Sequence, residues 1–402
     1  MLTHNIITEK MTFGGDCIAK IDGKTIFIPF AVPGEKLKIQ ITEEKRDYCR
    51  AKIVEIINPS PHRIKPVCPL YEKCGGCNLM HIDYEFQKEL KKEILKDLFI
   101  KNSVTPPEIT VISGDAFSYR NRFQLTDGSL SEKKSNTKVD FSFCPVAVKE
   151  INDYLKNTPQ INRPKGRCNI FAGESLTENP FTHKKIYIAE PKTVNQEQNF
   201  YPKNKRIKQI KKRYTGPVFS PENAAEVTIN EKKISFDVRG FFQSNLQVLS
   251  KSIEKVTDFL SGENVLDMYA GCGTFSVFLK DKFEKITLVE HNRDALLFAE
   301  QNLSVKNHIS FGLSGEKWAQ EQKNSNFDAV VIDPPRSGIE KGVMEFLKKS
   351  EIPVIRSVSC DPATHARDAK QLTESGRTLE KLFLLDFYPQ TSHIESLAWF
   401  LK

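Results

Sequence analysis

The C-terminal half of the chain repeats one pattern, in which a short apolar run ends at a polar or glycine-rich turn and a helical segment follows. The apolar runs cover residues 265–266, 286–289, 329–332 and 352–358. Short apolar runs between turns are typical of buried strands, and their alternation with helices predicts a parallel sheet. We therefore expect an α/β domain of the Rossmann-like class over residues 236–402.

The N-terminal part shows a different pattern, with apolar and polar positions alternating in short runs. Glycine and proline turns at residues 14–15, 22–23 and 33–34 separate these runs. Such alternation predicts short antiparallel strands, and their even spacing is typical of a small OB-like β-barrel. Basic residues gather at 45–52, where they suit contacts to phosphate. We expect a nucleic-acid-binding barrel over residues 1–60.

Residues 61–235 form the expected central domain, of mixed α and β character. Apolar residues recur at every fourth position over 86–98, which predicts an amphipathic helix over 84–100. We expect this helix to pack on the α/β domain. Arg120 and Arg122 lie on a predicted strand, where they either grip phosphate or face solvent.

The charge balance favours a polyanionic partner. Lysine and arginine number 59 against 51 acidic residues, a formal net charge of +8, and a basic excess attracts nucleic acid. A basic run at 203–213 fits the same partner or a solvated surface. No apolar run reaches the roughly 18 residues of a membrane-spanning helix, and the N-terminus lacks a signal-peptide layout. We expect a cytoplasmic, monomeric protein that does not enter a membrane.

Four of the nine cysteines have spacing typical of a metal centre. Cys68, Cys74 and Cys77 are separated by five and then two residues, and Cys144 follows in F-C-P-V. Close cysteines in a cytosolic chain indicate metal or redox chemistry rather than disulfides. Four thiolates suit either zinc or a four-iron cluster, and the spacing leaves both metals open.

Chemically active residue types stand at the ends of the apolar runs. Asp267 begins a D-x-x-x-G-x-G turn, Glu290 ends the next run about 20 residues later, and Asp333 and Cys360 end the third and fourth. A glycine turn lets a ligand approach the backbone, and an acidic residue at that distance accepts both hydroxyls of a ribose. The carboxyl ends of parallel strands meet at one edge, so these side chains should share one nucleotide-binding crevice.

This layout resembles the class I methyltransferase fold, which binds S-adenosylmethionine. Members that methylate amines usually carry an aromatic residue after the two prolines of D-P-P, whereas this chain has Arg336. The chain as a whole resembles the RNA uridine-5-methyltransferases, specifically their TRAM-bearing, iron–sulfur branch that modifies 23S ribosomal RNA. The motifs that carry the resemblance are C-x5-C-x2-C, F-F-Q-S-N, D-M-Y-A-G-C-G, D-P-P-R, S-C-D-P-A-T-H-A-R-D and H-I-E-S. The match is weak only over residues 152–217.

The resemblance implies a role for each part of the chain. Residues 1–60 would be the TRAM domain, 61–235 an iron–sulfur domain that binds RNA, and 236–402 the methyltransferase domain. It implies that a [4Fe–4S] cluster is held by Cys68, Cys74, Cys77 and Cys144, and that the cofactor is contacted by Gln243, Tyr269, Glu290 and Asp333. It further implies that Cys360 is the nucleophile, that Glu395 is the general base and that Phe241 stacks near the target base.

Methylation at C5 of uracil needs a thiol and a carboxylate together. C5 becomes nucleophilic only after Cys360 adds to C6 and forms an enolate. A neutral thiol is a weak nucleophile, so we expect the surroundings of Cys360 to lower its pKa. After methyl transfer the C5 proton must leave, and Glu395 is the expected acceptor. A uridine inside folded RNA must also be turned out of its stack.

Three alternatives are open. The first keeps the chemistry but acts on the transfer RNA T-loop, although relatives that do so generally lack both the cysteine cluster and the TRAM module. The second is cytosine-5 methylation, in which proline usually precedes the nucleophile, whereas Ser359 precedes Cys360 here. The third is a non-catalytic, metal-containing RNA-binding protein, which the presence of Gln243, Asp333 and Glu395 disfavours.

Overall fold

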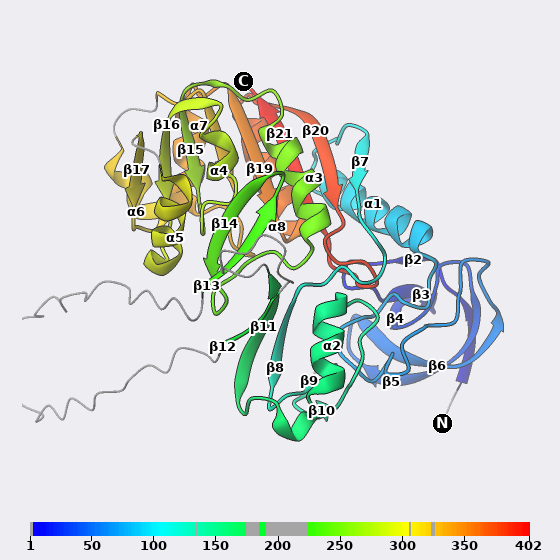
Figure 1. Cartoon of the computed structure of the whole chain (residues 1–402). Helices are drawn as coiled ribbons and strands as arrows, with labels where there is room; N and C mark the ends of the chain where they lie inside the picture. Colours follow the sequence, from blue (N-terminus) through cyan, green and yellow to red (C-terminus); the bar gives the residue numbers. More distant parts are fainter. Residues whose placement is uncertain (1–2, 134, 174–184, 190–223, 305–306, 323–325) are drawn as a thin grey trace, which may run out of the picture.

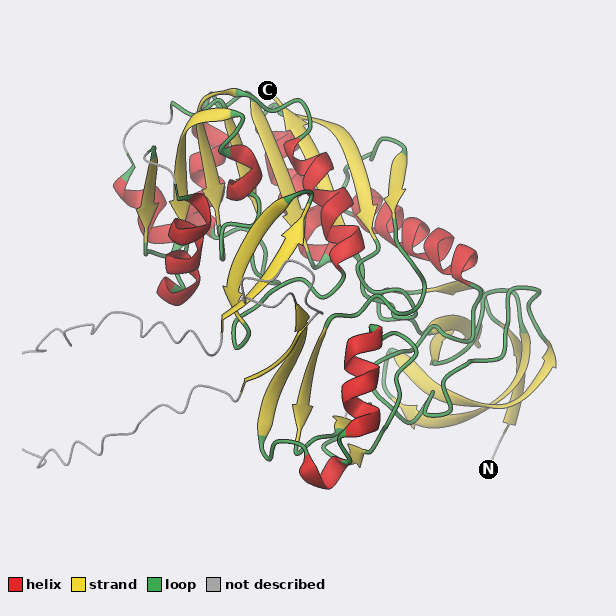
Figure 2. Cartoon of the chain, viewed as in Figure 1, coloured by secondary structure: helices red, strands yellow, loops and turns green. Residues whose placement is uncertain are grey.

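The computed structural model describes residues 3–133, 135–173, 185–189, 224–304, 307–322 and 326–402 (Figure 1). Its main sheets have six, three and eight strands, and helices cover both faces of the largest (Figure 2). The basic run at 203–213 lies outside the described residues. Within those residues, no helix combines the length and apolarity needed to cross a membrane.

The N-terminal sheet is open, whereas the sequence predicts a closed barrel. Its strands are β1 (Thr3–Ile7), β2 (Lys10–Met11), β3 (Cys17–Ile21), β4 (Lys24–Ile28), β5 (Lys36–Glu44) and β6 (Tyr48–Asn58), in the order β1-β5-β6-β4-β3-β2. Thr8 lies between the two edge strands. Its hydroxyl donates to Val32 O at 2.6 Å, and its backbone oxygen accepts from Gly34 N at 2.9 Å. These bonds tie the β1–β2 connection to the turn before β5, so the short β2 pairs with β3 alone.

The central domain is built on an antiparallel sheet of β8 (Arg122–Thr126), β11 (Arg167–Gly173) and β12 (Lys185–Ala189), in the order β12-β11-β8. One face of this sheet packs its apolar side chains against α2 (Lys149–Asn157). The shorter elements are β9 (Leu130–Ser131), β10 (Lys138–Val139) and a 3-10 turn at Gln160–Asn162. Arg120 precedes β8 and Arg122 begins it.

The large sheet has the strand order β17-β16-β15-β18-β19-β21-β20-β7. Five neighbouring strands are parallel: β15 (Gly262–Met268), β16 (Phe283–Val289), β17 (His308–Phe311), β18 (Ala329–Ile332) and β19 (Val354–Ser359). β21 (Glu395–Leu401) runs antiparallel between β19 and β20 (Thr378–Leu385). The four apolar runs of the sequence are thus strands β15, β16, β18 and β19, as predicted.

Helices bury the apolar side chains of this sheet on both faces. One face is covered by α1 (Tyr84–Lys101), α6 (Gly315–Glu321), α7 (Lys341–Lys349) and α8 (Pro362–Glu374). The other is covered by α3 (Leu246–Thr257), α4 (Ser276–Leu279), α5 (Arg293–Leu303) and the hairpin of β13 (Ala224–Ile229) and β14 (Lys232–Asp237). The β-α alternation places the helices so that the carboxyl ends of the parallel strands stay open.

Two elements of the N-terminal half complete this α/β unit. The helix predicted over 84–100 is present as α1 and packs on α8. The strand that follows it, β7 (Ile109–Ile112), pairs in parallel with β20 and forms the edge of the sheet. The expected packing of this helix on the α/β domain is therefore present, and β7, which also falls within residues 61–235, adds an edge strand to the α/β sheet.

Candidate active site

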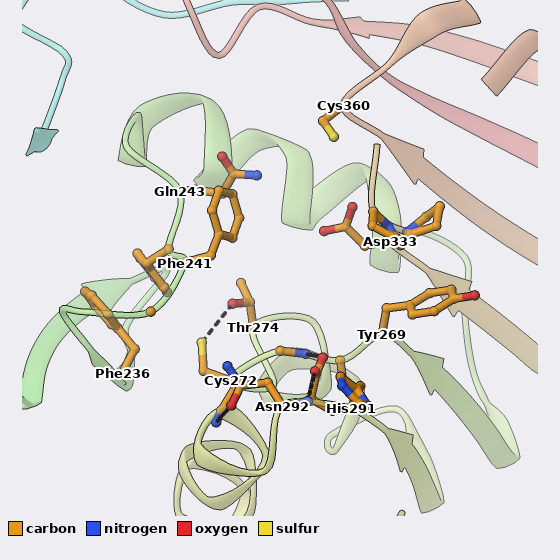
Figure 3. A pocket seen from close by; sticks show the side chains of 18 of the residues that line it. Phe236, Phe241, Gln243, Tyr269, Cys272, Thr274, His291, Asn292, Asp333 and Cys360 are labelled. Carbon is orange, nitrogen blue, oxygen red and sulfur yellow. Dashed lines mark hydrogen bonds between the residues drawn. The ribbon is translucent and has the colours of Figure 1, made fainter. Parts of the chain in front are cut away.

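A pocket of about 1170 Å³ opens at the carboxyl edge of the large sheet (Figure 3). It is formed where β15, β16, β18 and β19 end, together with the segment before α3. Five of the residues predicted to act together line it, namely Gln243, Tyr269, Glu290, Asp333 and Cys360. Glu395 is the first residue of β21 and pairs with Leu385, which lines the pocket. The fold therefore gathers both predicted catalytic residues and all four predicted cofactor contacts.

The turn after β15 presents backbone to this pocket. Tyr269, Gly271 and Gly273 have positive φ angles of 62°, 56° and 78°. A Cβ at Gly273 would stand 3.0 Å from the Cβ of Ala299 in α5, whereas a Cβ at Gly271 would meet nothing within 4 Å. Gly273 is therefore required by packing. Gly271 leaves open the space through which a ligand approaches the backbone.

Glu290 is held by the backbone around the same turn. One carboxylate oxygen accepts from Gly271 N at 2.9 Å, and the other accepts from Asn292 N at 2.5 Å. Asn292 is itself fixed as the N-cap of α5, because its side chain accepts from Asp294 N at 3.1 Å. These bonds orient a carboxylate on the pocket wall, where it could accept the hydroxyls of a ribose.

Two further carboxyl groups lie at this edge, and burial keeps both partly protonated. Burial, and then the charge of Glu290, raise the pKa of Asp333 to about 7. Burial also raises the pKa of Asp267 to about 7, against a hydrogen bond from Ser276. A cation bound near these buried carboxyl groups would stabilise their ionised forms, so this edge of the sheet favours a cationic ligand.

Cys360 lies at a tight strand-to-helix junction. The next residue, Asp361, caps α8 by accepting from Ala363 N at 3.0 Å, and Pro362 fills the first helical position. Burial, then Glu395 and Asp333, raise the pKa of the Cys360 thiol to about 11, and Arg336 lowers it only in part. The expectation of a lowered pKa is therefore wrong, because the strand ends that expose the thiol also place two carboxyl groups beside it.

Glu395 is buried next to the pocket, with 4% of its surface exposed. Burial, and then Asp333, raise its pKa to about 8, while a hydrogen bond from Gln243 opposes this rise. Gln243 was predicted as a cofactor contact. In the structure its side chain contacts Glu395, the predicted general base. Its Oε1 atom is buried and has no hydrogen-bond partner among the described residues, so a ligand that donates an N–H would satisfy it.

Phe241 stands at the edge of the same pocket. Its side chain is 70% exposed, although the neighbouring Phe242 is buried and stacks on Phe236 with ring centroids 3.9 Å apart. Phe242 therefore anchors the segment in the core. Phe241 lines the pocket, near Gln243 (Figure 3). An exposed aromatic ring beside a nucleotide-sized cavity is suited to stacking on a base.

The four predicted metal ligands lie in one region of the central domain. Burial, and then the neighbouring Cys144, raise the pKa of Cys77 to about 12, with smaller effects from Cys74 and Cys68. Asn152 fixes the chain at Cys144, since its side chain bonds both Cys144 N and Cys144 O, at 2.8 Å and 3.0 Å. Over the described residues, no group of three or more His, Cys, Asp or Glu side chains is arranged to hold a single metal ion.

Sequence reasoning missed a group of buried polar residues behind the site. Lys91 of α1 forms an ion pair with Asp386 at 2.6 Å, and both side chains are buried. Gln87, one turn earlier, bonds Gln390. These residues connect α1 to the segment before Glu395. No local pattern marks them, because a lysine or glutamine on a helix reads as a solvated position until its distant partner is known.

Family models match two parts of the chain. The model described as tRNA (uracil-5-)-methyltransferase matches residues 218–402, and the TRAM domain model matches residues 5–54. Among solved structures, the tRNA (uracil-54, C5)-methyltransferase of Pyrococcus abyssi, in complex with S-adenosyl-L-homocysteine, has a TM-score of 0.72 and 23% identity, covering 99% of this chain and 100% of that one. This structural likeness shows that the two proteins share a fold.

Relatives of similar length extend the match over the whole chain. An uncharacterized RNA methyltransferase of Treponema denticola is 36% identical over an alignment 438 positions long, which covers 98% of each chain. The 23S rRNA (uracil(1939)-C(5))-methyltransferase of Aliivibrio fischeri strain MJ11 is 31% identical, over 97% of this chain and 94% of the relative. With its TRAM domain and its α/β methyltransferase fold, the chain belongs to the RNA (uracil-5-)-methyltransferase family.

Proposed function

We propose that this enzyme methylates C5 of a uridine in 23S ribosomal RNA through a transient bond between Cys360 Sγ and C6 of the base. The observation that carries the proposal is the shared pocket. It combines an acidic residue suited to a ribose, Glu290, with a thiol at a strand end, and it has a buried carboxyl group, Glu395, beside that thiol. Nucleotide binding and pyrimidine chemistry thus meet in one cavity.

The residues around the pocket fit S-adenosylmethionine, which supplies an electrophilic methyl group when bound. Glu290 would accept hydrogen bonds from the ribose hydroxyls. The free space beside the backbone of Gly271 would let the ligand lie close to the turn. Asp333 and Tyr269 also line this part of the cavity. The acids gathered here complement the positive charge of a sulfonium, which supports a cationic methyl donor over a neutral ligand.

The target uracil would be held by an unpartnered side-chain oxygen and an exposed aromatic ring. The buried Oε1 of Gln243 has no hydrogen-bond partner among the described residues, and the N3–H of uracil is a donor that would satisfy it. The exposed ring of Phe241 would stack on a base turned out of the RNA. This stacking would offset part of the cost of unstacking, which is roughly a few kcal/mol. The contacts favour a uridine because N3 of cytosine carries no proton.

The chemistry assigns one bond-forming step to each reactive side chain. Cys360 loses its thiol proton to solvent, the thiolate Sγ adds to C6, and the electron pair of the C5–C6 double bond moves to C5 and O4 as an enolate. C5 would then take the methyl group of the bound donor, and the methyl–sulfur electron pair would stay with S-adenosylhomocysteine as the leaving group. The ionised form of Glu395 accepts the C5 proton, the C5–H electron pair re-forms the double bond, and the electron pair of the C6–S bond returns to sulfur, which leaves as a thiolate. The hydrogen bond from Gln243 keeps the Glu395 carboxyl in place for this transfer.

Sequence identity to the relatives favours ribosomal RNA over transfer RNA. The A. fischeri relative, named for 23S rRNA, matches nearly the whole chain at 31% identity, whereas the P. abyssi enzyme, named for transfer RNA, is 23% identical. In vitro methylation of transcribed 23S ribosomal RNA and transfer RNA by the purified enzyme separates the two. Methylation of transfer RNA alone would contradict the ribosomal assignment.

The central cysteines fit a [4Fe–4S] cluster, and we propose that Cys68, Cys74, Cys77 and Cys144 hold one. Four thiols without histidine are the ligand set of such clusters, and each binds a different iron, so their sulfurs need not converge on one point. The cysteines interact with one another through their charges, and Cys144 is fixed by Asn152. Anaerobic purification should give brown protein with about four irons per chain. Colourless protein with one zinc would overturn the assignment.

The test of the mechanism is to stop the reaction at the covalent stage. Replacing Glu395 by Gln removes the proton acceptor, so the enzyme should transfer the methyl group and then stay bound to the RNA. A denaturing gel would detect this adduct, and turnover should fall by about 10²–10⁴. Cys360→Ala should form no adduct and still bind S-adenosylhomocysteine, whereas the control Cys49→Ala, in the N-terminal sheet, should behave as the wild type. Turnover by Cys360→Ala would exclude the covalent route.

A further inference from the structure

Residues 386–394, between β20 and β21, lead directly into Glu395, and we call them the base loop. The loop is buried at its tip, where Gln390 is 2% exposed and has a φ angle of 68°. A left-handed conformation at a residue with a side chain costs about 1 kcal/mol or more and persists only when its surroundings hold it. The loop makes few hydrogen bonds of its own, such as Thr391 Oγ1 to Tyr388 O at 2.8 Å.

Asn78, which directly follows Cys77, forms hydrogen bonds with the tip of the base loop. Its backbone N–H donates to Gln390 O at 3.1 Å, and the N–H of Leu79 donates to the same oxygen at 3.0 Å. Its side-chain Oδ1 accepts from Ser392 N at 2.9 Å, and its Nδ2 donates to Ser392 Oγ at 3.0 Å. One side chain thus satisfies the backbone and the hydroxyl of a residue three positions before Glu395.

Helix α1 holds the other side of the loop. Gln87 accepts from Gln390 N at 3.0 Å and donates to its side chain at 3.0 Å. Lys91 bonds the Asp386 carboxylate at 2.6 Å and Tyr388 O at 3.0 Å. The loop is therefore fixed at its start by α1 and at its end by Asn78. Both contacts are distant in sequence, since Gln87 lies 303 positions before Gln390 and Asn78 lies 314 positions before Ser392.

A turn of the N-terminal sheet also contacts Asn78. Asn78 Nδ2 also donates to Gly14 O at 3.0 Å, in the turn before β3. A Cβ at Gly15 would stand 2.6 Å from Asn78 Nδ2 and 2.9 Å from Ser392 Cβ, at a φ of +88°. The TRAM turn, the cysteine segment and the base loop therefore meet at one side chain. Figure 1 shows the red loop after β20 reaching the N-terminal strands.

We infer that Asn78 is a positioning residue for the second half of the reaction, because it sets the base loop and through it the carboxyl group of Glu395. The inference rests on the proposed function of Glu395. Cys360 is attached to β19 and α8, on the far side of β21 from β20, and Asn78 bonds Gly14, Gln390 and Ser392 but not the Cys360 segment. Loss of Asn78 should therefore leave thiol addition and methyl transfer nearly intact and slow the removal of the C5 proton.

The test uses the full-length enzyme with bound metal, transcribed 23S ribosomal RNA and S-adenosylmethionine. Asn78→Ala should lower multiple turnover at least tenfold and raise the steady-state RNA adduct on a denaturing gel, with the dissociation constant of S-adenosylhomocysteine within twofold of wild type. Asn78→Asp keeps the acceptor for Ser392 N and should give less adduct. Gly15→Ala disturbs the junction from the other side and should give the same signature. The control Asn102→Ala removes a side-chain bond to Leu98 O, at the end of α1, and should change neither quantity.

The outcomes separate the inference from the function on which it rests. If Glu395→Gln traps adduct and both Asn78→Ala and Gly15→Ala do not, the positioning role is wrong. If Asn78→Ala loses adduct, turnover and cofactor binding together, the residue merely supports the fold and the inference is likewise overturned. If Glu395→Gln itself traps no adduct while Cys360→Ala is inactive, the assignment of the base fails first.

Discussion

Cys360 should be an unreactive thiol at neutral pH, although it is the proposed nucleophile. Its pKa is raised to about 11 by burial and by the carboxyl groups of Glu395 and Asp333, and Arg336 opposes the rise. At pH 7.5 a thiol with this pKa is ionised about once in 3,000 molecules, whereas an ordinary cysteine of pKa near 8.5 is ionised about once in ten. Cys360 should therefore react with a small alkylating agent about 300-fold more slowly than an ordinary cysteine.

Alkylation by iodoacetamide, followed by mass spectrometry of the Cys360 peptide, measures this directly. The rate should rise about tenfold per pH unit from pH 7 to 10, because the thiolate is the reacting form. Asp333→Asn removes a charge that raises the pKa and should shift the profile to lower pH, whereas Arg336→Gln should shift it to higher pH. Arg239→Gln is the matched control, since this pocket arginine is already paired with Asp237 at 2.6 Å.

A rate that levels off near pH 8 would refute the electrostatic reasoning. It would show that the thiolate is already present in the free enzyme and that Arg336 outweighs the two carboxyl groups. Profiles that coincide for the wild type, Asp333→Asn and Arg336→Gln would show that burial alone sets the pKa. The plateau, but not the coinciding profiles, would place the activation of Cys360 in the free protein.

Three further outcomes are expected. Lys91→Met leaves the buried Asp386 carboxylate without its charged partner, which costs about 3–5 kcal/mol and should lower the melting temperature of this 402-residue chain by about 4–6 °C. Asp386→Asn in the same chain should recover part of the loss, and an unchanged melting curve would contradict the pairing. Glu290→Gln should weaken S-adenosylhomocysteine binding about 10- to 100-fold in calorimetry while the fold stays intact, and equal affinity would exclude the ribose contact. The pKa values of Asp333 and Glu395 are raised to about 7 and about 8, so these two groups bind more protons in the folded protein than in the unfolded chain above about pH 4. Their contribution to the free energy of unfolding, measured by urea titration of the wild type against an Asp333→Asn, Glu395→Gln variant, should fall as pH rises from about 4 to 8.

The sequence predicts best what is decided locally. Glu290, Asp333 and Cys360 end short apolar runs, and such runs with their turns are sufficient to identify strands and the edge at which they end. Helix α1 was likewise predicted from its spacing of apolar residues. These features depend on neighbours within one turn or one strand, so their pattern is visible in a single stretch of sequence.

What the sequence could not predict depends on partners far apart in the chain. The placement of β7 beside β20 leaves no local mark, because a four-residue strand has the same composition in any sheet. The open N-terminal sheet depends on how Thr8 bonds to a turn more than 20 residues later. The raised pKa of Cys360 likewise arises from Glu395 and Asp333, which meet it only after folding.

The bond between Asn78 and Ser392 spans 314 residues of sequence, and this has a consequence for how the protein is made. At about 5–20 residues per second, a ribosome needs about 15–60 s between the synthesis of these two residues. During that time α1 and β7 lack the strands that they contact in the folded protein. The junction at Asn78, which leads into Glu395, is therefore completed only after β20 and the segment that follows it have been synthesised.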